Sequence, residues 1–535
     1  MWGISSLGDY LGDTQSKCWR EHKSIKDRRL VKYAVDLLDS EWPQDYLSGA
    51  RMVDVFIKHE VDVRPLILPS SQKVQKMMDI LGWSSSSNIE IKELASRILA
   101  HLACDIDLAQ FPGAIRSISS LLGLALLESL ASDKHNCKAI CSTPDIIAKI
   151  MSPIYSDTLV QDINITPWQD VVNGAFRVVH RLIRAPEWTG GRRLAHEISC
   201  SKQAVSNLER ILNQGNTGSQ QLQMQAMEIL TELALDPAAN LAMETKENLI
   251  NKQLRVFLDE EKEEDLRVTA GKTLAALLSK TTGTISVMCI MSEYNPIVEQ
   301  VTEILDAKNK AIYRTIAAEI LENLCTLHTM DKNHVQNTLL PKVLAEVLTS
   351  KKKPSSEALE RQVSEALGDI EENPLQDDEE NQRLERNGQI NPSEQNEMQA
   401  TMMELKEALL SLTSVIFDKL IISAEDFDNV ARKVAPGVGE FVAKLKTIVE
   451  DNCEATANSL RLVKLCGQIA VTMMRRGHCN TQCKDQKFVE TLSKASRITC
   501  NLESCMLFAG TDGGAKKTAR PLLSDIVKEA EALVA

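Results

Sequence analysis

The sequence predicts an all-α protein built as a solenoid of stacked helical repeats. Only 4% of the 535 residues are aromatic, which favours helices packed through aliphatic side chains over β-sandwiches. A small residue followed by Leu four and seven positions later recurs along the chain and places three apolar residues on one helical face. After the copy at Ala226, further copies begin 44 and then 47 residues later. A period in the forties is typical of helical repeat proteins.

The N-terminal segment, residues 1–46, is predicted to contain a capping helix. From Ser24 to Ser40, apolar residues lie on one helical face and Lys and Arg on the other, and terminal repeats need such a polar outer face. The start of the chain has neither the basic nor the apolar region of a secretory signal. The most apolar stretch, Ile118 to Ala131, is shorter than the ~20 residues of a membrane helix. We therefore expect a soluble chain.

Residues 47–350 carry the main array of repeats. The close copies of the spacing begin at Ala95, Ala226, Ala270 and Ala317, and looser copies begin at Gly49, Gly123, Ala175, Ala408 and Leu462. A second motif opens near Pro, Gly or Ser and shares the period, because its copies end at Leu212, Leu258, Leu305 and Leu348. Each repeat is thus predicted to be a multi-helix unit. Such units must stack, since one alone cannot bury its apolar face.

The segment 351–400 interrupts the pattern. It is poor in aliphatic residues, dense in Asp, Glu, Asn and Gln, and broken by Pro354, Pro374 and Pro392. Such a composition cannot bury enough apolar area to offset chain entropy, so it predicts a disordered acidic insertion. It is either a solvated spacer, or a segment that folds onto a basic partner or into the chain's own groove. Residues 401–535 resume the repeats and end in capping helices.

The repeats resemble those of the armadillo superfamily. LRVTAGKTLAALLS and IYRTIAAEILENLC look like the third helix of its repeat, while NPIVEQVTEIL and APGVGEFVAKLKTIVE look like the helix before it. Asn136 and Asn240 fit its turn between repeats. This resemblance covers roughly residues 47–474 and implies an armadillo-like (ARM/HEAT type) right-handed superhelical solenoid with a concave binding face. The chain is also similar to a divergent plant-type armadillo set, some of whose longer members carry membrane segments.

The resemblance further implies which residues face the groove. In import-receptor armadillo proteins, an Asn just before the last Leu of the third helix grips a peptide backbone, and a Trp lies one turn earlier. Here that position holds His101, Ser129, Arg181, Glu232, Ala276, Asn323, Ser414 and Gln468. Only Asn323 matches, and Glu319 stands in place of the Trp, which disfavours a nuclear-import receptor. We expect a groove of mixed chemistry formed by His101, Arg181, Glu232, Asn323 and Gln468.

No catalytic motif is complete. His196 and Glu197 begin an HExxH sequence, but Cys200 holds the position of its second His. The stretch 510–518, GTDGGAKKT, has Ala515 where a phosphate-binding loop needs Gly, and no strand precedes it. We therefore expect no enzyme activity, no catalytic residues and no cofactor.

The thirteen cysteines follow no disulfide framework and mostly lie in apolar helical stretches, as expected for reduced, buried thiols. His478, Cys479, Cys483, Cys500 and Cys505 could supply a tetrahedral zinc site. Their spacings are not the CxxC pairs of zinc ribbons, so we interpret them as packed or loop thiols and predict no metal site. Zinc at Cys479 to Cys505 stays an alternative that metal analysis would decide.

These observations favour a non-enzymatic scaffold that binds a protein or peptide. A net charge of −13 and a pI near 5.4 offer no global attraction for nucleic acid. The alternative function is a peripheral membrane or trafficking adaptor. We expect a cytoplasmic location, with the nucleus or a membrane surface as alternatives.

Overall fold

The computed structural model describes residues 10–12, 14, 29–81, 89–106, 121–156, 159, 166–214, 219–280, 294–326, 330–349, 392–420, 430, 437–508 and 521–534. Within these residues every regular element is a helix, which confirms the all-α prediction. The stretch 510–518 and nearly all of the predicted acidic insertion lie outside the described residues. The chain divides into two compact units, Met1–Val256 and Phe257–Ala535. The domain boundaries expected after residues 46, 350 and 400 stay a prediction.

The first unit consists of short and medium helices. Its α-helices are α2 (Leu30–Leu37), α3 (Pro43–Lys58), α4 (Arg64–Ile67), α5 (Ser71–Leu81), α6 (Ile89–Leu102), α8 (Leu121–Leu130), α9 (Lys134–Cys141), α10 (Pro144–Tyr155), α12 (Thr166–Arg184), α13 (Gly191–Cys200), α14 (Lys202–Asn213) and α15 (Gln220–Leu235). Short 3-10 helices, η3 (Ala103–Asp105) and η5 (Glu187–Thr189), follow α6 and precede α13. Helix α16 (Met243–Leu258) spans the boundary between the units.

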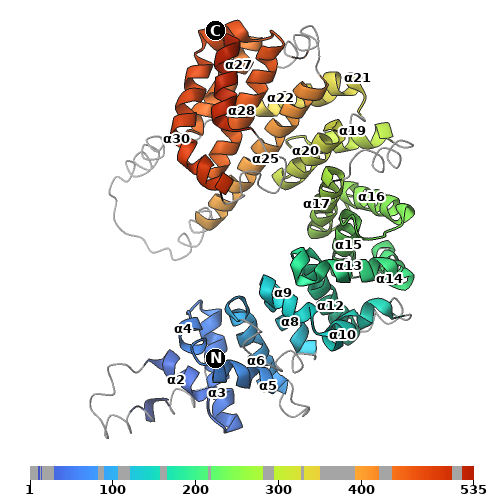
Figure 1. Cartoon of the computed structure of the whole chain (residues 1–535), viewed down its shortest axis with the longest axis vertical. Helices are drawn as coiled ribbons and strands as arrows, with labels where there is room; N and C mark the ends of the chain where they lie inside the picture. The colour runs from blue at the N-terminus through green and yellow to red at the C-terminus, as the bar shows by residue number, and fades with distance from the viewer. Residues whose placement is uncertain are drawn as a thin grey trace, which may run out of the picture. The chain divides into compact units, whose positions relative to one another are not determined.

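The second unit contains α17 (Glu264–Lys280), α19 (Tyr294–Ile304), α20 (Ala311–Thr326), α21 (Lys332–His334), the π-helical η6 (Val335–Leu339), α22 (Leu340–Thr349), α25 (Pro392–Lys419), α27 (Val438–Asp451), α28 (Ala457–Arg475), α29 (Asn480–Asp485), α30 (Phe488–Phe508) and α31 (Leu523–Val534). Helices α27, α28 and α30 pack side by side in the orange and red part of Figure 1.

The helices that carry the small–Leu–Leu spacing, here called third helices, stack in chain order. In the first unit, α3, α6, α8, α12 and α15 each pack against the next. In the second unit, α17, α20, α25 and α28 do the same, and the terminal α31 continues the row. Ala95, Ala226, Ala270 and Ala317 are completely buried. A small residue at this position lets neighbouring helices approach closely, as the spacing predicts.

Among the described residues, the second motif forms α10, α14, α19, α22 and α27, and α5 takes the corresponding place before α6. Helices α5, α10, α14, α19, α22 and α27 each pack against the third helix that follows them. Asn side chains bind carbonyl groups left free at helix ends: Asn136 Nδ2 donates to Ile106 O at 2.8 Å, and Asn207 Nδ2 donates to Ile154 O at 2.8 Å. Because both Asn side chains are buried, these bonds satisfy backbone groups that would otherwise lose their solvent partners.

No helix among the described residues is long and apolar enough to cross a membrane.

Candidate functional site

The five predicted groove residues lie on five different third helices: His101 on α6, Arg181 on α12, Glu232 on α15, Asn323 on α20 and Gln468 on α28. The apolar face of each helix packs in the stack and so fixes the rotation of the helix about its own axis. That rotation sets the direction in which the predicted side chain points. Because these helices belong to two separate units, the residues are described unit by unit.

In the first unit, two of the predicted residues link neighbouring third helices. Arg181 Nη1 donates to Ser132 Oγ at 3.0 Å, and its Nη2 lies 3.5 Å from Glu128 Oε1 on α8. Glu232 pairs with Arg184 of α12 at 3.2 Å. His101 lies half-buried near the end of α6. Arg181 and Glu232 therefore have intramolecular partners, and their role in binding stays a prediction.

One turn further along the α12–α15 contact, His180 and Glu228 face each other. Their Nδ1 and Oε2 atoms are 3.3 Å apart. Burial lowers the pKa of His180 to about 4, and the charges of Arg184 and Arg181 contribute to this lowering. Burial also raises the pKa of Glu228. The imidazole is thus neutral at ordinary pH, and the contact is not a pair of full charges.

In the second unit, Asn323 also contacts a neighbouring third helix. Its Nδ2 donates to Ala275 O of α17 at 3.1 Å. The adjacent Glu322 accepts a hydrogen bond from Ser411 Oγ of α25 at 2.9 Å. The amide that could grip a peptide backbone is therefore bound to the backbone of the preceding repeat.

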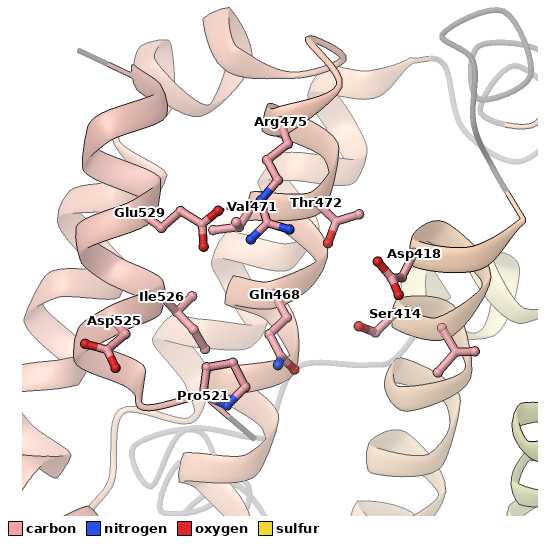
Figure 2. A pocket seen from close by; sticks show the side chains of 11 residues that line it. Ser414, Asp418, Gln468, Val471, Thr472, Arg475, Pro521, Asp525, Ile526 and Glu529 are labelled. Atoms are coloured by element: carbon pink, nitrogen blue, oxygen red, sulfur yellow. Dashed lines mark hydrogen bonds and ion pairs between the residues drawn. The ribbon is translucent and has the colours of Figure 1, made fainter. Parts of the chain in front are cut away.

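A polar pocket of about 320 Å³ lies between α25, α28 and α31 (Figure 2). Two residues of the predicted groove position, Ser414 on α25 and Gln468 on α28, line it together. The other lining residues are Val415 and Asp418 of α25, Val471, Thr472 and Arg475 of α28, and Pro521, Asp525, Ile526 and Glu529 at α31. The register of the repeats thus brings two predicted positions to one cavity.

The charges of this pocket, here called the α25–α28–α31 pocket, are mainly negative. Asp418, Asp525 and Glu529 supply three carboxylates, and Arg475 supplies one guanidinium. Arg475 Nε donates to Glu529 Oε1, and this hydrogen bond raises the pKa of Arg475. Arg475 is paired with Glu529, whereas Asp418 and Asp525 pair with Lys419 and Lys528, two lysines that are not among the described residues lining the pocket.

Two hydrogen bonds from other helices hold α31 as a wall of the pocket. Glu503 Oε1 of α30 accepts a hydrogen bond from Leu523 N at 3.0 Å, at the first turn of α31. The same oxygen lies 2.6 Å from Lys464 Nζ of α28, and both side chains are almost fully buried. At the other end, Asn480 Nδ2 donates to Leu533 O at 3.0 Å. Both ends of α31 are therefore fixed by side chains of other helices.

The candidate zinc residues are split between the interior and the surface. Cys479 and Cys483 are buried, with their Sγ atoms 3.6 Å apart. Cys500 and Cys505 are exposed on α30. Among the described residues, no group of three or more His, Cys, Asp and Glu side chains is arranged to hold a metal ion.

Sequence reasoning missed most of the pocket. Asp418 follows Ser414 by one helical turn, and Thr472 and Arg475 follow Gln468 by one and two turns. Extending the predicted face by the helical period would have found these residues. Asp525 and Glu529 carry no such signal, because α31 lacks the small–Leu–Leu spacing.

Comparisons with known proteins bear on the fold. No protein-family model and no curated protein matches the chain. Among solved structures, an engineered protein is similar at 13% identity and a TM-score of 0.51, over 95% of this chain and 99% of that chain. A SYS-1/POP-1 complex is similar at 11% identity and a TM-score of 0.48, over 99% and 96% of the two chains. Kap121p bound to Pho4p is similar at 12% identity and a TM-score of 0.39, over 94% and 55%.

At such low identities, structural likeness concerns the fold alone. The engineered protein shares the arrangement over nearly the whole chain, and the third helices of each unit stack in order. The chain has an all-α fold in which helical repeats stack in order within each unit, as in a solenoid.

Proposed function

We propose that this chain is a non-enzymatic protein-interaction scaffold whose α25–α28–α31 pocket receives a side chain of a protein or peptide partner. The observation that carries the proposal is the pocket itself, lined by Ser414 and Gln468 from two successive third helices and by polar residues around them. Hydroxyl and amide groups next to apolar Val471 and Ile526 suit a peptide, which offers both polar backbone and apolar side-chain atoms.

The charge of the pocket favours a partner that carries Lys or Arg. Asp418 and Asp525 face the cavity from opposite walls, α25 and α31. Lys419 and Lys528 pair with these carboxylates at 3.1 and 3.6 Å but are not among the described residues that line the pocket. A cationic side chain that enters the pocket would compete with Lys419 and Lys528 for these carboxylates, whereas the acidic segment 351–400 would be repelled by them.

A pair of synthetic peptides tests this proposal. We expect a short peptide with two Lys residues to bind the full chain, and its Nε-acetylated form to bind about tenfold more weakly, because acetylation removes the charge. Fluorescence anisotropy at low salt measures both affinities. Equal affinities of the two peptides would contradict a charge-selective pocket.

Variants show whether binding occurs in this pocket. Replacing Asp418→Asn together with Asp525→Asn should weaken the Lys peptide about tenfold. Glu440→Gln, which removes an exposed carboxylate at the start of α27, is the matched control and should leave affinity unchanged. A similar loss in both variants would point to a general effect of net charge.

The other expectations belong to the same proposal. We place the chain in the cytoplasm, with the nucleus as the alternative, and assign it to the plant-type armadillo set that its repeats resemble. Imaging of a fluorescent fusion in cells tests the location. Comparison with homologous sequences, once aligned, tests the assignment.

One feature favours the alternative function, a peripheral membrane or trafficking adaptor. Leu507 and Phe508 at the end of α30 are 47% and 97% exposed, and exposed apolar side chains of this kind mark surfaces that bind membranes or proteins. Flotation of the full chain with lipid vesicles tests it. Binding that is lost in Phe508→Ser would support the adaptor over the soluble scaffold.

A further inference from the structure

Two buried cysteines of the second unit lie in contact. Cys479 is the N-cap residue of α29, and Cys483 lies one turn later on the same helix. Neither side chain is exposed to solvent, and Cys483 Sγ donates to Cys479 Sγ at 3.6 Å. Cys137 and Cys141 on α9 have the same spacing in the sequence, but Cys137 Sγ donates to Ala131 O instead. The sulfur contact is therefore a property of α29 and does not follow from the spacing alone.

The first turn of α29 holds the two thiols close together, but not in the geometry of a disulfide. Cys483 N donates to Cys479 O at 2.8 Å, and a helical turn of this kind places the two Cα atoms about 6 Å apart, within the range that a disulfide spans. The Cβ atoms of helical residues four positions apart lie about 5–6 Å from each other, whereas a disulfide needs about 3.8 Å. A bond between the sulfurs must therefore distort this turn and, with it, the backbone hydrogen bond.

We expect this turn to open more readily than the long helices around it. Helix α29 has only six residues, and a helix so short has little stability of its own. The loop before it contains Gly477 at a φ of 74°, in the left-handed region that favours glycine. Thr481 and Lys484 on its outer face are exposed. Local opening of α29 brings the thiols to solvent without unfolding the unit.

The same short helix holds two neighbouring helices. Asn480 Nδ2 donates to Leu533 O of α31 at 3.0 Å, and Gln486 Nε2 donates to Gly439 O of α27 at 2.6 Å. Asn480 lies between the two cysteines, so a distorted first turn moves its side chain away from α31. Gln486 follows the last turn of α29 and lies outside the strained loop, so its contact with α27 can persist.

We propose that Cys479 and Cys483 are an oxidative modification site, at which a low-molecular-weight disulfide joins the two thiols and thereby releases the C-terminal end of α31. One thiol loses its proton, attacks a sulfur of the small disulfide and displaces the first small thiol. The other protein thiol then attacks the protein sulfur of this mixed disulfide and displaces the second small thiol. Two electrons and two protons pass to the small disulfide, so the exchange needs no other oxidant.

The strain in the product makes the modification reversible. Strained disulfides are reduced more readily than relaxed structural ones and are typical of regulatory bonds. Reduction restores the first turn of α29 and the contact of Asn480 with α31. The inference does not depend on what the α25–α28–α31 pocket binds, because it concerns the hold of α29 on α31.

Oxidised glutathione is the probe for the test. The full chain is incubated with it, free thiols are then blocked, and the chain is digested with trypsin without reduction. Cleavage after Arg476 and Lys484 gives one peptide, residues 477–484, that contains both cysteines. We expect this peptide to lose two hydrogen atoms about tenfold faster than Cys137 and Cys141 become linked. A peptide that stays reduced, or that only carries bound glutathione, would overturn the proposal.

Hydrogen exchange tests the release of α31. In the oxidised chain we expect exchange in the last turn of α31 to rise about tenfold, while α27 near Gly439 keeps its protection. Cys483→Ser, treated in the same way, is the matched control: it cannot form the bond, but it keeps the exposed Cys500 and Cys505, which glutathione also modifies. Unchanged exchange in the oxidised natural sequence, or an equal rise in Cys483→Ser, would show that this disulfide does not release α31.

Discussion

Single polar side chains join one repeat to the next in both units. Arg97 of α6 pairs with Asp54 of α3 at 2.9 Å, and Arg461 of α28 pairs with Glu407 of α25 at 3.0 Å. Arg97 and Lys58 together hold the pKa of Asp54 below its usual value, although burial opposes them. Ion pairs that solvent still reaches contribute about 1 kcal/mol or less each. Their main effect is therefore to fix the register between repeats.

The buried pair Lys464–Glu503 should behave differently. Both side chains are nearly inaccessible, so replacing Glu503 takes the carboxylate away from a buried ammonium group, at a cost of about 3–5 kcal/mol. We expect Glu503→Gln to lower the thermal stability of the second unit and to increase hydrogen exchange in α31, whose first turn Glu503 also binds. Glu490→Gln, which removes an exposed carboxylate of the same helix, is the control. Unchanged exchange in α31 would show that Glu503 does not hold this helix.

The stability of the first unit should depend on pH through His180. Its pKa is about 4 in the folded chain and near 6.5 when unfolded, so the unfolded chain binds more protons between these values. The stabilising contribution is complete above pH 6.5 and is lost as the pH falls toward 4.

Urea unfolding at pH 7 and pH 5 measures this effect. We expect the loss between these pH values to be about 2 kcal/mol larger in the natural sequence than in His180→Asn. The raised pKa of Glu228 acts in the opposite direction but is present in both proteins. Identical pH dependence of the two proteins would contradict a neutral, buried His180.

At the scale of helices, the closeness of packing depends on small residues at a few contacts. Gly271 on α17 faces α20 and the end of α16. A Cβ atom there would lie 2.5 Å from Ile316 Cγ2 and 2.7 Å from Phe257 Cδ2. Gly439 on α27 has room, since its nearest neighbour would be 3.7 Å away. Two glycines of the same unit thus differ in the space around them.

The two Ala substitutions should therefore have opposite signs. Gly271→Ala should overpack the contact and cost about 1–3 kcal/mol. Gly439→Ala should be neutral or stabilise by up to about 1 kcal/mol, because Ala has the higher helix propensity. Scanning calorimetry of the second unit's transition measures both changes. A gain of stability in both variants would mean that backbone freedom, and not space, decides at these positions.

At the scale of the whole chain, the predicted acidic insertion separates two parts of the second unit. Helices α20 and α22, before it, pack directly against α25 after it. Residues outside 350–391 therefore make the contacts that join these helices. We therefore predict that this packing does not depend on the insertion.

Residues 351–391 can be replaced with a Gly–Ser linker of equal length. We expect the helical signal in circular dichroism and the melting temperature to stay unchanged. Deleting α31 instead, by ending the chain at residue 508, should lower the melting temperature, because Leu523 and Ala530 are fully buried in their contacts. A loss of stability with the linker would show that the insertion is part of the folded unit.

The repeat pattern predicted the third helices and their partners because apolar periodicity acts locally. A helix with Ala226, Leu230 and Leu233 on one face must bury that face, whatever its neighbours are. The same periodicity assigns Ser414 and Gln468 to equivalent faces of α25 and α28, and both residues line the α25–α28–α31 pocket.

The sequence by itself determined the helices, their order and the face that each one buries. Only the tertiary structure decided which polar residues meet: that Arg181, Glu232 and Asn323 bind neighbouring helices, and that Asp525 and Glu529 complete a pocket with Gln468. The physical reason is distance along the chain. Helix periodicity relates residues three or four positions apart, whereas these contacts join residues tens of positions apart through the packing of whole repeats.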